Sequence, residues 1–157
     1  MKTSLSLFTA LVCILLFIGS VAVTKFLGTT VFHRYSNKRL FIGYIVAFFA
    51  AIPAYALLLF AWSIIVIKAL DMPFDVSTSP VTKLYMAVNA IIITNIACVI
   101  ARASIDKILD FHQKYNASNL EKHPLKFAIA HRQQIVNIYR YFFLLSSVFM
   151  LFIIWFK

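Results

Sequence analysis

Four long apolar runs constrain this chain more than any other feature. Three of them lack Asp, Glu, Lys and Arg altogether: Thr3–Thr24 with 22 residues, Leu40–Ile67 with 28 and Leu84–Ala101 with 18. The fourth, Ile135–Phe156, has 22 residues and is interrupted only by Arg140, near one end. A helix needs about 20 apolar residues to cross the hydrocarbon core of a bilayer. The runs are continuous, whereas a membrane strand would alternate, so they predict helices.

The predicted fold class is therefore all-α: a polytopic membrane protein with four transmembrane helices in an up-down bundle. We expect the spans at about 5–24, 40–67, 84–101 and 135–156, in a single domain that covers residues 1–157. Composition supports this, because 62% of the residues are hydrophobic and only 13% are charged. A soluble domain carries about 25% charged residues, so the composition excludes both a soluble globular domain and a disordered chain.

Residues 102–134 form the only sizeable polar segment. Ile105, Ile108 and Leu109 recur there at helical spacing among charged residues, so the third helix is expected to continue past the membrane. Pro124 suits the first turn of the next helix, which is expected to run on to the C-terminus. The third and fourth helices are thus predicted to extend into a cytoplasmic helical hairpin.

The basic residues predict the orientation. Segments 25–39 and 102–140 hold 11 of the 15 Lys and Arg residues, and the other side holds 4. Because basic residues stay on the cytoplasmic side, loops 25–39 and 102–134 should be cytoplasmic and both termini outside, most simply in a bacterial inner membrane. An alternative is a signal peptide cleaved after Ser20-Val21-Ala22. Cleavage would leave 25–39 outside, and the charge rule argues against that.

Polar and kinked positions inside the spans are candidates for helix contacts. Pro53 lies at the middle of the second span, where it removes a backbone donor and favours a kink. Asn89 and Asn95 lie in the third span, and an asparagine in hydrocarbon prefers a partner across a helix interface. We expect these three residues at a partner or helix interface.

The net charge of +10 is explained by the membrane rather than by nucleic acid. Basic side chains near a bilayer surface are attracted to anionic headgroups by about 1 kcal/mol each. We therefore expect contacts with anionic lipid headgroups on the cytoplasmic side, and no nucleic-acid partner. The residues expected to make them are Arg34, Lys38, Arg39, Arg102, Arg132 and Arg140.

The sequence lacks the residues that catalysis or metal binding would need. No span holds an acidic residue, which weighs against a self-contained proton-coupled transporter. The four histidines follow no ligand spacing, so we expect no metal, no cofactor and no catalytic residues. A membrane enzyme is the weakest hypothesis; its residues would be Arg102, Asp106, Asp110 and His112.

The expected function is that of a non-catalytic integral membrane protein acting through helix–helix contacts. It would be an accessory, assembly or immunity-type subunit, bound to another integral membrane protein or to itself. The alternative is a small homo-oligomeric channel, hole-former or facilitator. Such a pore needs a polar stripe, for which the candidates are Asn89, Thr94, Asn95, Ser146 and Ser147.

Overall fold

The computed structural model describes residues 2–69, 73–76 and 79–157 and confirms the all-α fold. The long helices are α1 (Lys2–Phe26), α3 (Asn37–Ile64), α4 (Pro80–Tyr115) and α6 (Arg132–Phe156). Short elements join or extend them: the π-helices η1 (Leu27–Val31) and η2 (Ile65–Ala69), α2 (Phe32–Arg34), the 3-10 helix η3 (Ala117–Asn119) and α5 (Leu125–Ala130). In the described chain, four helical segments are long and apolar enough to cross a membrane.

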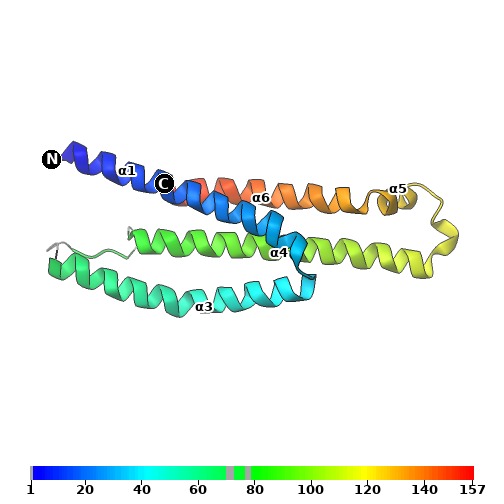
Figure 1. Ribbon diagram of the computed structural model, residues 1–157, viewed down its shortest axis with the longest axis horizontal. Coiled ribbons are helices and arrows are strands. Elements are labelled where there is room, and N and C mark those ends of the chain that lie inside the picture. The colour runs from blue at the N-terminus through cyan, green and yellow to red at the C-terminus, as the bar shows by residue number, and fades with distance from the viewer. Residues whose placement is uncertain (1, 70–72, 77–78) are drawn as a thin grey trace.

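The long helices alternate in direction, as an up-down arrangement requires (Figure 1). Most of the packing joins α3 to α4, α4 to α6, and α6 to α1, with a smaller contact between α1 and α4. The arrangement is therefore a row with α4 and α6 at its centre. In the most apolar window of α4, 44% of the residues are buried, against 6% in that of α3.

Two apolar clusters hold the row together. One joins Phe32 of α2 and Leu40 of α3 to Ile92 and Val99 of α4 and Val136 of α6. The other joins α4 to α6 nearer the chain ends, through Ala87, Ile91, Leu151 and Trp155. Phe17 and Val21 of α1 pack against this second cluster. The buried side chains thus come mainly from the two central helices, α4 and α6, against which α1 and α3 pack.

The predicted hairpin beyond the apolar spans is confirmed. At 1.5 Å per residue, the 36 residues of α4 extend about 54 Å, well beyond a hydrocarbon core of about 30 Å. Figure 1 shows α4 running past the α2–α3 turn and returning through α5 and α6. Arg132 joins the two arms through ion pairs with Asp106 (2.7 Å) and Asp110 (2.9 Å).

The prediction that one uninterrupted helix runs from Pro124 to the C-terminus is wrong. His131, with φ −111° and ψ 20°, separates α5 from α6. Its ring stacks on the ring of Phe127 with centroids 4.2 Å apart, and its Nδ1 lies 2.9 Å from the Phe127 carbonyl oxygen. This local contact favours a non-helical backbone at His131, which hydrophobic periodicity does not reveal.

The predicted loop 25–39 is also wrong, because only Tyr35 and Ser36 interrupt the helices there. Gly28 lets η1 approach α6 so closely that an added Cβ would lie 2.6 Å from Leu144 Cδ2. The Thr24 hydroxyl donates to the Ser20 carbonyl at 2.8 Å, within the helix. The charges that mark the end of a span do not end its helix, since water and headgroups also accommodate a helical backbone.

Pro53 lies inside α3 without ending it. Figure 1 shows α3 bowed along its length, whereas α4 is straighter. Proline removes one backbone hydrogen bond and crowds the preceding turn, which accounts for curvature of this kind.

Candidate functional site at the basic turn

The most unusual chemistry surrounds the break between α2 and α3, at Tyr35 and Ser36. We call this region the basic turn: residues 32–39 together with Arg102 of α4 and Arg140 of α6. Phe32 is its centre and is only 1% exposed. The guanidinium carbons of Arg102 and Arg140 lie 4.1 Å and 5.7 Å from the Phe32 ring centroid. Both are within the range of cation–π attraction, so two cations share one aromatic ring.

Arg102 ties α4 to the turn. Its Nη1 donates to the Phe32 carbonyl at 2.7 Å and its Nη2 to the Tyr35 carbonyl at 3.2 Å. Its Nε donates to the side-chain oxygen of Asn37, the first residue of α3. Carbonyl groups at a helix C-terminus lack partners within the helix, and Arg102 satisfies two of them here. The three acceptors are neutral, so none of them balances the positive charge.

Arg140 is buried, with an exposed fraction of 4%. Its Nη1 donates to Nε2 of His33, and Nε2 can accept this bond only while it carries no proton. The Arg140 Nε has no hydrogen-bond partner. In the described parts of the chain, Arg140 makes no ion pair with a carboxylate. A buried guanidinium in this state keeps its full charge without a counter-charge.

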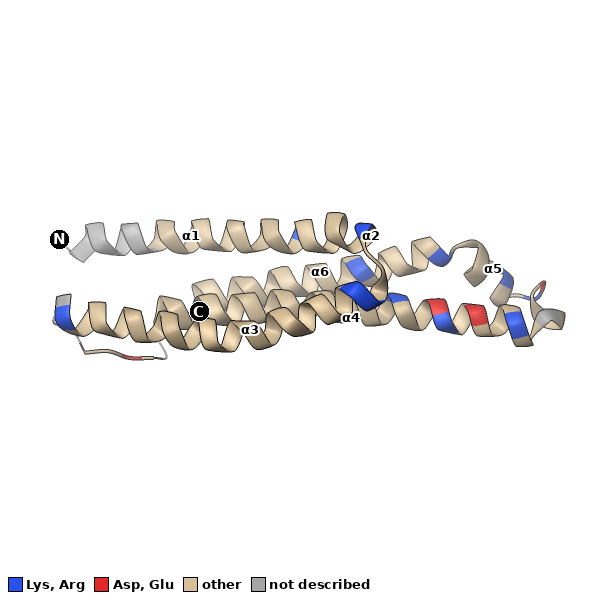
Figure 2. Ribbon diagram, turned by 60° about the horizontal axis from the view of Figure 1, so that its bottom comes forward, with Lys and Arg blue, Asp and Glu red and all other residues tan. Residues whose placement is uncertain are grey.

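The structure separates the six basic residues predicted to contact lipid into two groups. Arg34, Lys38 and Arg39 are exposed on either side of the break, beside Arg102 and Arg140. Arg132 lies in the hairpin and is bound to two carboxylates. Figure 2 shows acidic positions in the hairpin and in the loop at the opposite end of the molecule, and none at the basic turn among the described residues.

The residues predicted for helix interfaces do not meet at this site. Asn95 is 1% exposed, and its Nδ2 donates to the Ile91 carbonyl of its own helix at 2.8 Å. Asn89 is half-buried, and its Nδ2 donates in the same way to the Tyr85 carbonyl at 2.9 Å. The side-chain oxygens of both asparagines are buried without a partner. Pro53 is exposed on α3.

Sequence reasoning missed Phe32 and Asn37, considered His33 only as a possible metal ligand, and expected Tyr44 at the membrane interface rather than in the helix packing. Tyr44 of α3 is 8% exposed, and its hydroxyl has no partner. One signal for the site was present: Asn95, Cys98 and Arg102 follow one another at spacings of three and four, so they share a face of α4. That face points into the helix interface, where Asn95 and Cys98 are buried.

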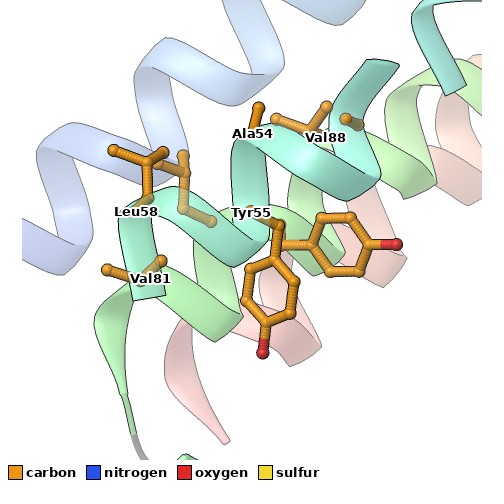
Figure 3. A pocket seen from close by; sticks show the side chains of 8 residues that line it. Ala54, Tyr55, Leu58, Val81 and Val88 are labelled. Atoms are coloured by element: carbon orange, nitrogen blue, oxygen red, sulfur yellow. The ribbon is translucent and has the colours of Figure 1, made fainter. Parts of the chain in front are cut away.

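A second feature is a small apolar hollow between α3 and α4, of about 130 Å³ (Figure 3). Ala51, Ala54 and Leu58 line it from α3, and Val81 and Val88 from α4. The rings of Tyr55 and Tyr85 stack at its edge with centroids 4.3 Å apart. Its lining offers apolar surface and almost no polar atoms.

Neither metal ligands nor similarity to known proteins indicates a function for this chain. Across residues 2–69, 73–76 and 79–157, no group of three or more His, Cys, Asp or Glu side chains is placed to hold a metal ion. No protein-family model, curated protein or solved structure matches the chain.

Proposed function

We propose that this chain is a non-catalytic integral membrane protein that acts by binding another membrane protein through α3, as an accessory, assembly or immunity-type subunit. The observation that carries the proposal is the exposed face of small residues on α3. By the charge rule, the basic turn and the hairpin would lie on the cytoplasmic side, most simply of a bacterial inner membrane.

The small residues of α3 form one stripe. The first four recur at spacings of four, three and four residues, so they fall on one side of a helix, and the fifth follows on the same side after the exposed Leu57. All are exposed. A Cβ added to Gly43 would meet no atom of the described residues within 4 Å, so the space directly above it is open in this part of the chain. The stripe consists of Gly43, Ala47, Ala50, Ala54 and Ala61.

Small residues have a specific meaning in a membrane. Lipid tails are as apolar as leucine, so burial of large side chains gives little driving force between helices in a bilayer. Close backbone approach does give one, and small residues at spacings of four allow it. The hollow at Ala51 and Ala54 adjoins the stripe and could receive a larger side chain from a partner helix.

The structure offers less support for a pore formed between copies of the chain. Two of the polar residues proposed to line it, Thr94 and Asn95, are 6% and 1% exposed inside the chain's own helix interface. Ser147 is fully buried there as well. A pore between copies needs such groups on the outer surface. We therefore favour the accessory subunit over the channel, hole-former or facilitator.

The test is native mass spectrometry of the untagged chain, gently extracted from its own membrane. We expect a defined complex with another polypeptide. Ala50→Leu should abolish it, because a leucine on the stripe prevents close approach of the partner backbone. The matched control is Ala56→Leu, which makes the same change at another exposed position of α3, on the opposite side of the helix from the stripe.

Loss of the complex with Ala50→Leu and its retention with Ala56→Leu would support the proposal. Equal effects of the two variants would contradict α3 as the binding surface. Detection of a homo-oligomer with nothing else bound would overturn the accessory-subunit proposal and favour the homo-oligomeric channel, hole-former or facilitator.

A further inference from the structure

The basic turn holds a buried positive charge, that of Arg140, with which no carboxylate of the described residues forms an ion pair. Arg140 is 4% exposed, its Nε has no partner, and its Nη1 donates to a neutral His33 nitrogen. Arginine keeps its proton in proteins, so it cannot relieve burial by becoming neutral. A buried cation without a counter-charge is unfavourable. An anion close to this site would therefore stabilise the fold.

Arg140 is one of several cations gathered at the turn. Arg102 shares the Phe32 ring with it and bonds only to neutral oxygens. Along α4, the next carboxylate after Arg102 is that of Asp106, which attracts Arg102 electrostatically but forms its ion pair with Arg132, at 2.7 Å. Three further cations are exposed around the break in the helix: Arg34, Lys38 and Arg39.

The position of the basic turn in the fold indicates which kind of anion would bind there. Of the four long helices, α1 and α3 have their connection here, while α4 and α6 continue into the hairpin (Figure 1). Tyr35, Tyr139 and Tyr141 are exposed near this level, as aromatic residues are at a membrane surface. The phosphate groups of lipids occupy the same level, and guanidinium groups bind phosphate through paired N–H donors.

We propose that the basic turn binds the phosphate group of an anionic phospholipid. Arg102 and the exposed cations of the turn contact the phosphate, and the buried charge of Arg140 lies behind them. The lipid tails lie against the exposed apolar side chains of α1 and α3. The bound phosphate is then the counter-charge that Arg140 lacks. This site is separate from the α3 stripe and does not depend on a partner protein.

The test compares phosphatidylglycerol with phosphatidylcholine of the same acyl chains, each added to the purified full chain in detergent micelles. Native mass spectrometry counts the lipids retained, and a thermal melt gives Tm. We expect phosphatidylglycerol to be retained and to raise Tm, and phosphatidylcholine to do neither.

Two variants and a matched control assign the effect to the site. Arg102→Gln should weaken retention of phosphatidylglycerol about fivefold, the factor that corresponds to one basic residue at a lipid surface. Because Arg102 also ties α4 to the turn, Arg140→Met is a second variant that keeps those hydrogen bonds, and it should reduce the rise of Tm with phosphatidylglycerol. Arg132→Gln, whose arginine is already bound to two carboxylates, should change neither.

Separate arms with inorganic phosphate and with glycerol phosphate identify the source of the phosphate group. If either raises Tm as much as phosphatidylglycerol does, the phosphate site stands and the lipid as its source is overturned. Equal retention of the two lipids would overturn the whole proposal. So would an Arg132→Gln variant that weakens binding as much as Arg102→Gln, or a bound polypeptide that supplies the counter-charge in place of lipid.

Discussion

The hairpin and the basic turn each use an arginine of α6, eight residues apart, in opposite ways. In the hairpin, Arg132 is partly exposed and is bound to Asp106 and Asp110. At the basic turn, Arg140 is buried, and among the described residues His33 is its only polar side-chain partner. The comparison shows that burial and pairing, not residue type, decide what a charge does to stability. A paired cation near water contributes little, and an unpaired buried one is a functional candidate.

The largest effect is expected from removing the ring that both arginines of the basic turn share. Phe32→Ala should lower the free energy of unfolding by about 3–5 kcal/mol, because Phe32 is almost completely buried in the cluster that joins α2 to α4 and α6. Unfolding in mixed micelles measures this. Phe49→Ala is the control, since Phe49 is 62% exposed on α3. Similar losses of unfolding free energy for both variants would contradict the conclusion that the buried Phe32 ring stabilises the packing of α2 against α4 and α6.

The second prediction tests the unpaired charge itself. In micelles free of anionic lipid, Arg140→Met should raise the free energy of unfolding, because it removes a buried charge; replacing whole buried ion pairs by apolar groups of similar volume stabilises by up to about 1–4 kcal/mol. The same unfolding measurement applies. Arg132→Met in the hairpin should lower stability slightly, because it leaves two carboxylates without their cation. A loss of stability with Arg140→Met would show that the buried guanidinium is already compensated.

The third prediction concerns the paired arginine. Asp106→Asn should lower the free energy of unfolding by at most about 1 kcal/mol, since both partners are partly exposed and Asp110 remains bound to Arg132. The effect should shrink at high salt, which screens such pairs. A double-mutant cycle with Arg132→Gln gives the coupling. A coupling of several kcal/mol would show that the Arg132 pair contributes strongly to stability, which would contradict the contrast between Arg132 and Arg140.

The smallest effect is expected at the tip of the hairpin, where Lys126 and Glu121 form an exposed pair at 2.7 Å. The hydrogen bond from Lys126 holds the pKa of Glu121 below its ordinary value. Any stability from this pair is therefore present above the ordinary glutamate pKa and is lost as pH falls through the lowered one. An NMR titration of Glu121 should show the lowered midpoint, and Lys126→Gln should raise it. Glu121→Gln should lower Tm only slightly at neutral pH, because exposed pairs contribute little.

Much of the fold could be predicted because the bilayer imposes strong rules on a sequence. Three charge-free runs and a fourth interrupted only by Arg140 identified the four apolar helices, and the periodicity around Ile105 and Leu109 identified the extension of α4. Helix ends were harder, because the rules for spans concern apolar length and not backbone geometry. Gly28 and His131 show this: helical structure continues through Gly28 where a loop was expected, and it is interrupted at His131 where a helix was expected to continue.

The sequence indicated only some of the residues of the candidate site. Arg102 and Arg140 were recognised as basic residues near span ends, together with Arg132. Their different surroundings depend on which helices are neighbours and on their relative heights. The periodicity of single helices carries no such information. Phe32 was not recognised, and His33 was considered only as a possible metal ligand, because both lie in a segment that was taken for a loop.

The sequence by itself determined that the chain is all-α, that it has four apolar helices, and that its basic residues lie mainly on one side. Those properties follow from local composition, because a hydrocarbon core accepts only long apolar segments with satisfied backbones. Only the tertiary structure decided that Arg140 is buried beside Phe32 with no ion pair to a carboxylate of the described residues, and that Arg132 is paired. The reason is physical: burial and electrostatic pairing arise between helices far apart in sequence, at distances that only their packing sets.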